Sequence, residues 1–161
     1  MQLLLIRHAL PELAEVTEGR ANPSLTDEGR AQALRLPAAL APYRITGLFS
    51  SPQKRALETA APVAQILGLP VTQREGLAEY DYEQPHYIPM HEVLERAPET
   101  YARIKAGWLP ESVDGDAFRA RVLGAIDEIV AATDNDAPWR SSATAASSTS
   151  FCRNCSDWSA R

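Results

Sequence analysis

An arginine and a histidine, Arg7 and His8, follow the apolar run LLLI near the start of the chain. A continuous apolar run that ends in a charged pair is typical of a central parallel strand that opens onto a loop. Ligands of open α/β sheets bind at the carboxyl ends of the strands, so this pair stands where a ligand would lie. A single histidine after a strand is more often structural than catalytic, and its role therefore depends on its neighbours.

Three later segments supply polar groups that could act together with His8. The segment FSSPQKRALETA places Arg55 in the first turn of a predicted helix, whose N-terminal N–H groups could themselves hold an anion. Asn22 and Thr26 follow the first loop in NPSLT, and Glu79 lies among apolar and aromatic residues in EGLAEYD. The chain carries a net charge of −5, so an anionic substrate would need arginines gathered at one site.

The elements that must position these residues alternate between strands and helices. Residues 2–6, 45–51 and 71–73 are predicted strands, and the first of them should be buried. The polar and aromatic residues 75–93 are predicted to form a long connection with helical pieces that lies over the site. A pattern of this kind, with helices between successive strands, predicts an α/β fold.

Capping signals predict where the helices begin and end. Thr26 is a plausible N-cap, and Pro37 should kink or end the helix that follows it. Ser51 and Pro52 should open a helix that Gly68 closes, with the Ser51 hydroxyl as a cap rather than a phosphate ligand. The last predicted helix covers residues 114–132, with one apolar face made of Phe118, Val122, Ile126, Ile129 and Val130.

Four segments together make the chain similar to the histidine phosphatase superfamily, the phosphoglycerate mutase-like proteins. They are LLLIRHA (3–9), NPSLTDEGRAQA (22–33), FSSPQKRALETA (49–60) and GLAEYD (76–81), and their order and spacing are specific. Ala9 stands where the family usually has glycine, a change that removes no catalytic group. The resemblance extends to about Asp136 and implies a three-layer α/β/α fold with a mostly parallel central sheet.

The resemblance also implies a role for each site residue. His8 would be the nucleophile that becomes phosphohistidine, and Glu79 would protonate the leaving alcohol and then activate water. Arg7 and Arg55 would bind the phosphoryl oxygens, with Asn22 as a hydrogen-bond donor at the mouth of the site. The implied activity is hydrolysis of a phosphomonoester on a phosphorylated small molecule or phosphoprotein, and no metal or organic cofactor is implied.

Each of these residues also has a structural interpretation. Arg55 could pair with Glu58 on its own helix, and Glu79 could be a solvated loop carboxylate. His86 and His91 lie in the connecting stretch and are expected at the surface.

The end of the chain departs from the family pattern. The family carries a second phosphate-binding histidine after a late apolar strand, whereas this chain has only three histidines, His8, His86 and His91. From Ala137 onward there is no Leu, Ile, Val or Met. We therefore expect residues 1–136 to form an incomplete phosphatase-like domain, and 137–161 to be a disordered tail that has lost the C-terminal strand and helix and cannot fill the strand's place.

A frameshift near residues 135–138 would explain this change. Reading G/C-leaning codons of the tail two nucleotides later can give an apolar strand followed by His-Gly-Gly, provided that three third bases are chosen accordingly. If the serines are encoded by TCN codons, Arg140–Ser141 and Ser141–Ser142 give Val, Leu, Ile or Phe in that frame whatever the third base is. The CRNC motif at 152–155 would then be a coincidence rather than a metal or redox site.

The composition of the chain argues against a membrane or nucleic acid as a binding partner. No apolar run is long enough to span a bilayer, and the run at the start meets Arg7 and His8 at once, so neither a membrane span nor a signal peptide is expected. Nothing resembles a basic stripe for nucleic acid. A cytoplasmic protein is expected, and the oligomeric state is not indicated.

Two other functions, and a chain that does not fold, are also compatible with the sequence. One activity is a catalytically dead module that binds phosphate or a phosphoprotein through Arg7 and Arg55. The other is phosphoryl transfer of the phosphoglycerate mutase type, which the short chain disfavours because mutases use insertions to retain their substrate. The remaining possibility is a chain that never folds stably, which the lack of a cooperative unfolding transition would reveal.

Overall fold

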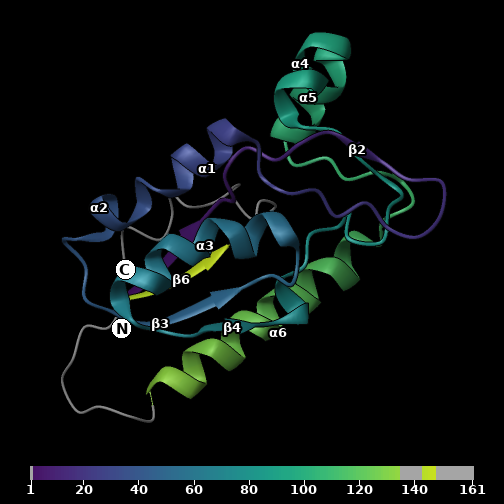
Figure 1. Ribbon diagram of the computed structural model, residues 1–161. Coiled ribbons are helices and arrows are strands. Elements are labelled where there is room, and N and C mark those ends of the chain that lie inside the picture. The colour runs from purple at the N-terminus through teal and green to yellow at the C-terminus, as the bar shows by residue number, and fades with distance from the viewer. Residues whose placement is uncertain (1, 135–142, 148–161) are drawn as a thin grey trace.

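A parallel four-stranded sheet between two layers of helices forms the centre of the fold. The computed structural model describes residues 2–134 and 143–147. Helices α1 (Asp27–Ala33), α2 (Leu36–Leu40) and α3 (Lys54–Leu67) lie on one face of the sheet, and α6 (Gly115–Asp134) lies on the other (Figure 1). The predicted three-layer α/β/α architecture is therefore confirmed. The strands, in spatial order, are β1 (Gln2–Ile6), β6 (Ala143–Ser147), β3 (Ile45–Ser50) and β4 (Val71–Gln73).

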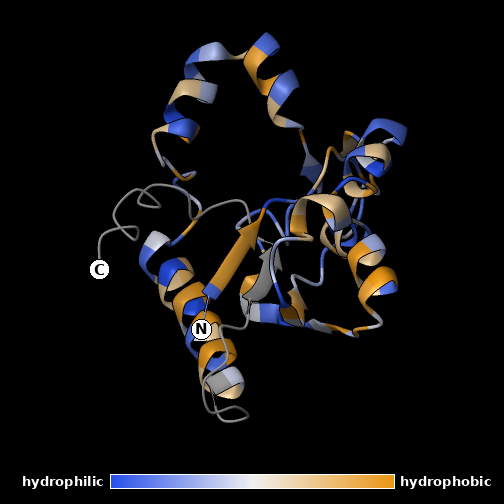
Figure 2. Ribbon diagram, turned by 90° about the vertical axis from the view of Figure 1, so that its left-hand side faces the viewer, coloured by the Kyte–Doolittle hydropathy of each residue, from blue (hydrophilic) through white to orange (hydrophobic). Residues whose placement is uncertain are grey.

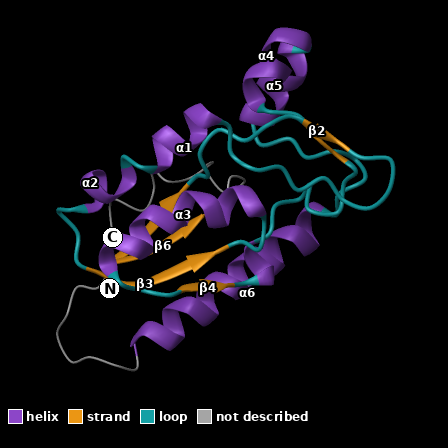
Figure 3. Ribbon diagram, in the orientation of Figure 1, coloured by secondary structure: helices purple, strands orange, loops and turns teal. Residues whose placement is uncertain are grey.

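The remaining elements lie mainly beyond the carboxyl ends of these strands (Figure 3). The short strands β2 (Ala14–Glu15) and β5 (His86–Tyr87) pair antiparallel with each other there. The helical pieces expected in the connection 75–93 are present as η1 (Glu75–Leu77) and the start of α4 (Met90–Arg96), while α5 (Pro98–Lys105) lies beyond the predicted range. The helices are α1 (Asp27–Ala33), α2 (Leu36–Leu40), α3 (Lys54–Leu67), η1 (Glu75–Leu77), α4 (Met90–Arg96), α5 (Pro98–Lys105) and α6 (Gly115–Asp134).

Local signals set most helix ends where they were predicted. The Thr26 hydroxyl accepts a hydrogen bond from the Gly29 N–H at 2.9 Å and caps α1. Helix α1 ends before Pro37, which lies in the first turn of α2. Gly68 ends α3 with a left-handed φ of 64°, a conformation that glycine adopts without a steric penalty.

The core is divided between the two faces of the sheet. Leu48 packs with Leu40 and Val63 on the α2–α3 face, and Leu4 and Ile6 of β1 join this cluster. Phe49 points to the other face and packs against the cluster of Leu77, Ala125 and Ile129. Neighbouring strand residues face opposite sides, so one apolar strand serves both layers.

Strand β1 is less buried than predicted. It is apolar after Gln2 (Figure 2), yet Leu5 is 42% exposed and none of its residues is fully buried. Leu5 faces away from the cluster that holds Leu4 and Ile6, and α6 packs over Phe49 of β3 rather than over β1. The expectation of a buried, central strand is therefore wrong, because β1 lies at one end of the strand order in the described sheet.

The sequence-based expectation for the end of the chain is wrong for residues 143–147. These residues form β6, which pairs in parallel with both β1 and β3 and thus fills the place of the strand thought to be lost. Strand pairing uses backbone N–H and C=O groups, so Ala, Thr and Ser can occupy this position without large apolar side chains. The predicted disorder of 137–142 and 148–161, and the predicted loss of a C-terminal helix, lie outside the described residues.

Candidate active site

The predicted site residues meet at the carboxyl edge of the sheet. Arg7 and His8 follow β1, Arg55 lies in the first turn of α3 just after β3, and Glu79 follows β4 and η1. Parallel strands end at the same edge, so three segments far apart in the sequence converge there.

The loop that carries His8 is held by hydrogen bonds on two sides. The Ala9 N–H donates to the Thr59 hydroxyl of α3 at 2.9 Å. On the other side, the Leu10 carbonyl accepts from the Thr26 N–H at 3.0 Å, at the start of α1. Gly29 permits this approach, because a Cβ atom there would lie 2.0 Å from the Leu10 oxygen. The position of His8 is thus set by α1 and α3 together.

His8 is buried and has one defined neutral form. Its Nδ1 lies 2.8 Å from the Ala9 carbonyl oxygen, which can only accept a hydrogen bond, so Nδ1 carries the proton and Nε2 keeps its lone pair. Burial, together with the charges of Arg55 and Arg7, lowers the pKa of His8 from 6.5 to about 4, although the bond to Ala9 acts the other way. The ring is therefore neutral near pH 7, as a nucleophile requires.

Glu79 is a buried carboxyl beside His8, not a solvated loop residue. Its Oε1 lies 3.7 Å from His8 Nε2, and its Oε2 accepts from Arg55 Nη2 at 3.1 Å. Its backbone N–H donates to the Gln53 side-chain oxygen at 3.1 Å. The carboxyl group thus lies beside both the predicted nucleophile and the predicted phosphate ligand.

Arg55 is 1% exposed and pairs across the site rather than along its helix. Its Nη2 donates to Glu79 and to both oxygens of Asp81, at 2.9 and 3.0 Å for the latter. The alternative partner, Glu58, instead accepts from the Leu25 N–H at 2.7 Å. Burial alone would lower the pKa of Arg55, but Glu79 and Asp81 outweigh it and raise that pKa. The interpretation as an Arg55–Glu58 pair is therefore wrong.

Two buried atoms of the site have no hydrogen-bond partner. They are His8 Nε2 and Arg55 Nε, and among the described side chains no other buried nitrogen or oxygen atom is in this state. Unsatisfied buried polar atoms are rare and costly, which makes them informative. One is a lone pair that can attack and the other is a cationic donor, so the two complement an electrophilic, anionic group.

The structure adds three residues to which the sequence interpretation gave no role. Gln53, in the quoted motif with Arg55, donates to Asp81 at 3.0 Å and accepts from the Ser51 hydroxyl at 2.9 Å. Asp81 ends the motif that contains Glu79. Tyr87 comes from β5, and its ring lies 4.2 Å from the Arg55 guanidinium carbon. The motifs thus contained the signal for Gln53 and Asp81, whereas only the fold brings Tyr87 to the site.

Ser51 and Asn22 hold the start of α3. Gln53, not Ser51, is the N-cap residue, and the Ser51 hydroxyl accepts from the Gln53 N–H at 3.2 Å. Asn22 is exposed, and its side-chain oxygen accepts from the Lys54 N–H at 2.8 Å. This bond uses the acceptor of Asn22, and its amide donor remains the group predicted to meet a ligand.

The other predicted residues lie at the surface. Arg7 is exposed next to His8, and His86 and His91 are exposed, as expected. Within residues 2–134 and 143–147, no group of three or more His, Cys, Asp or Glu side chains could hold a metal ion. None of the helices in that part is long and apolar enough to cross a membrane. The CRNC motif lies outside the described residues.

Known proteins are similar to this chain in sequence and in fold. The chain is 31% identical over 113 residues to phosphoserine phosphatase 1 of Hydrogenobacter thermophilus, covering 69% of this chain and 52% of that protein. The chain thus spans about half the length of the curated relatives it matches.

Solved structures share the architecture. A mycobacterial glucosyl-3-phosphoglycerate phosphatase superposes with a TM-score of 0.65 at 23% identity, covering 91% of this chain and 72% of that one. The alpha-ribazole phosphatase from Shigella flexneri gives a TM-score of 0.59 at 26% identity, with 92% and 73% covered. The family model of the histidine phosphatase superfamily (branch 1) matches residues 3–143. The chain therefore belongs to the histidine phosphatase superfamily.

Proposed function

We propose that this site hydrolyses phosphomonoesters through a phosphohistidine on His8. The observation that carries the proposal is the pair of buried unpartnered atoms, His8 Nε2 and Arg55 Nε, beside the Glu79 carboxyl. A phosphoryl group bound between them would offer phosphorus to Nε2 and an anionic oxygen to Nε.

The reaction proceeds in two balanced steps. In the first, the Nε2 lone pair forms a bond to phosphorus, the bond from phosphorus to the ester oxygen breaks, and Glu79 gives its proton to the departing alcohol. In the second, Glu79 takes a proton from water while the water oxygen bonds to phosphorus. The P–N bond then breaks, which releases inorganic phosphate and restores neutral His8.

The charges of the site support this sequence. Arg55 and the exposed Arg7 supply positive charge for the phosphoryl oxygens, and Asn22 supplies an amide donor near the start of α3. A bound phosphate dianion beside Glu79 favours the protonated carboxyl by repulsion of like charges. The acid needed for the first step is thus produced by substrate binding itself.

The names of the relatives support a choice of substrate class. Curated relatives are named phosphoserine phosphatases, and similar structures are named phosphatases of glucosyl-3-phosphoglycerate and alpha-ribazole. Each is named as a phosphatase, and phosphoserine and glucosyl-3-phosphoglycerate are phosphate esters of small molecules. A phosphorylated small molecule, with phosphoserine as the first to test, is therefore the proposed substrate.

Turnover should be slow, because the chain lacks the second histidine of the family. The two other histidines, His86 and His91, are exposed. Loss of one transition-state donor costs about 10²–10³ in rate in comparable oxyanion sites. A second candidate function, an anion-binding module without turnover, is favoured by the same absence.

Trapping the phosphoenzyme separates these two functions. The protein is mixed with phosphoserine or p-nitrophenyl phosphate, quenched in alkali, where phosphohistidine survives, and mapped by mass spectrometry. The proposal expects phosphate on His8, none in His8→Gln, and unchanged labelling in the surface control His91→Gln. Phosphate affinity without any phosphohistidine would overturn hydrolysis and support the binding module.

A further inference from the structure

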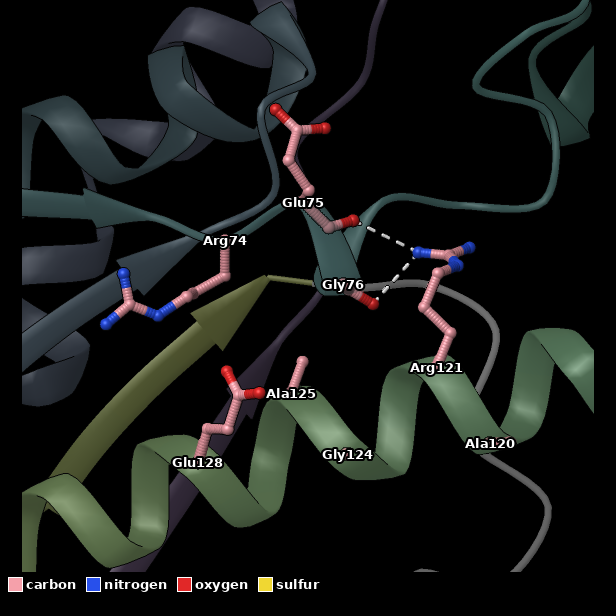
Figure 4. A pocket seen from close by; sticks show the side chains of 8 residues that line it. All are labelled: Arg74, Glu75, Gly76, Ala120, Arg121, Gly124, Ala125 and Glu128. Atoms are coloured by element: carbon pink, nitrogen blue, oxygen red, sulfur yellow. Dashed lines mark hydrogen bonds between the residues drawn. The ribbon is translucent and has the colours of Figure 1, made fainter.

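Arg121 is one of the residues that line a small pocket. The pocket has a volume of about 430 Å³, lies between η1 and α6, and its lining includes none of His8, Arg55 and Glu79 (Figure 4). The side chain of Arg121 rises from α6 at one end of this pocket and points at the backbone of η1 (Figure 4).

Arg121 makes three hydrogen bonds to the segment that leads into Glu79. Its Nη1 donates to the carbonyls of Glu75 and Gly76 at 3.1 and 2.9 Å, and its Nη2 donates to the Ala78 carbonyl at 2.9 Å. The Glu75 carbonyl already accepts from the Ala78 N–H at 3.0 Å, which closes the turn of η1. Arg121 therefore adds a second donor there, and it also bonds the carbonyls of Gly76 and Ala78. A planar guanidinium can bond these three carbonyls at once, which a single ammonium group does less well.

Packing reinforces this contact. Gly76 lies so close to α6 that a Cβ atom there would be 2.5 Å from the Ala125 Cβ. Leu77 is buried in the cluster with Ala125 and Ile129. The turn is therefore pressed against α6 on one side and bonded by Arg121 along its carbonyls.

The consequence is that the backbone of Glu79 is held from two directions. Gln53 accepts from its N–H on the site side, and Arg121 bonds the carbonyl of the preceding residue, Ala78, on the α6 side. The distance of 3.7 Å between Glu79 Oε1 and His8 Nε2 depends on this backbone position. Catalysis tolerates little displacement of the reacting groups, so the position of the carboxyl matters.

We infer that Arg121 is a positioning residue, which sets the Glu79 carboxyl for proton transfer by bonding the carbonyls of Glu75, Gly76 and Ala78. This inference rests on the proposed function, because it concerns the acid and base of that reaction. It assigns to α6 a part in catalysis although α6 contributes no group to the substrate.

The test compares Arg121→Met, Arg121→Lys and the control Arg119→Met, which changes an exposed arginine of the same helix. Methionine keeps an apolar stem over Phe118 but loses every donor, and lysine keeps the charge and part of the donors. The first measurement is native-state hydrogen exchange, which needs no activity. We expect exchange at the Ala78 and Glu79 amides to rise about tenfold or more in Arg121→Met, less in Arg121→Lys, and not in Arg119→Met.

The second measurement is kcat/KM for two esters. Phosphoserine has a leaving group that needs a proton, whereas the dinitrophenolate of 2,4-dinitrophenyl phosphate does not. Arg121→Met should lower kcat/KM for phosphoserine by about 10² and that for the dinitrophenyl ester by less than about threefold, with partial recovery in Arg121→Lys.

The outcomes are distinct. Equal losses on both esters, or unchanged exchange at Glu79, would overturn the positioning role. If the unmodified protein acts on neither ester, the proposed function fails, and exchange at Glu79 decides by itself whether Arg121 positions this residue.

Discussion

The guanidinium carbon of Arg55 lies 4.2 Å from the centre of the Tyr87 ring, so a residue of the β5 connection covers the most buried charge of the site. The Tyr87 ring also meets the His8 ring edge-on, at 6.3 Å between centroids. The long connection after η1 is therefore part of the site and not only a cover above it.

Removing the Tyr87 ring should destabilise the protein and loosen Arg55. We expect Tyr87→Ala to lower the free energy of unfolding by about 3 kcal/mol, as for other buried aromatic truncations, and Tyr87→Phe by less than about 1 kcal/mol. Urea unfolding measures both variants, and phosphate affinity should fall several-fold only in Tyr87→Ala. The control is Tyr82→Ala, whose ring pairs with the half-exposed Arg20 and should cost less than about 1 kcal/mol. Equal losses at Tyr82 and Tyr87 would contradict a special role for the buried pair.

The lowered pKa of His8 predicts how stability depends on pH. The folded protein keeps His8 neutral down to about pH 4, whereas the unfolded chain takes up a proton near 6.5. Stability from this group is thus complete above pH 6.5 and is lost as the pH falls toward 4, by up to about 3 kcal/mol. Chemical unfolding between pH 4 and 8 should show this slope, and His8→Gln should reduce it. The same slope in both proteins would show that His8 is not the group responsible.

Two substitutions of Asn22 should separate its structural role from its proposed role in binding phosphate. Its oxygen bonds the Lys54 N–H, so Asn22→Ala should cost about 1 kcal/mol of unfolding free energy, as at other helix caps. Asn22→Asp keeps the acceptor but replaces the amide donor with a negative charge. Its stability should be close to that of the unmodified protein, while isothermal titration should show weaker phosphate binding. Unchanged affinity in Asn22→Asp would remove this residue from the proposed phosphate site.

Two glycines provide a matched pair. A Cβ at Gly29 would meet the Leu10 oxygen at 2.0 Å, whereas a Cβ at Gly124 on α6 has nothing within 4 Å. We expect Gly29→Ala to lower the melting temperature markedly and to shift the loop that carries His8. Gly124→Ala should instead stabilise the helix by up to about 1 kcal/mol through its better helix propensity. Calorimetry of the two variants tests this, and a destabilised Gly124→Ala would contradict the open space at that position.

The end of the chain predicts a result at the level of the gene. The family match stops at residue 143, five to eight residues after the proposed frameshift near 135–138. Sequencing the source DNA from about codon 125 onward should reveal a frame that encodes an apolar strand followed by His-Gly-Gly. If no frame encodes this motif, the frameshift hypothesis is wrong and the anion-binding module becomes the leading function.

Elements with a local signal could be predicted from the sequence by itself. Thr26 accepts a bond from a residue three positions ahead, Pro37 cannot continue a helix, and Gly68 adopts a left-handed φ, so each acts within its own turn. His8 was singled out because it follows a predicted strand, and Arg55 because it opens a predicted helix, whereas the roles proposed for them and for Glu79 came from motifs shared with the histidine phosphatase superfamily. These features depend on neighbours in the sequence, or on a rule that holds for the whole fold class.

Only the tertiary structure decided which partners these residues have. Arg55 pairs with Glu79 and Asp81, 24 and 26 residues away, rather than with Glu58 on its own helix. Tyr87 contacts Arg55 from β5, which pairs with β2. Residues 143–147 filled the gap between β1 and β3 although their side chains predicted a tail. In each case the deciding energy is the satisfaction of buried polar or backbone groups by distant segments, which composition and periodicity do not encode.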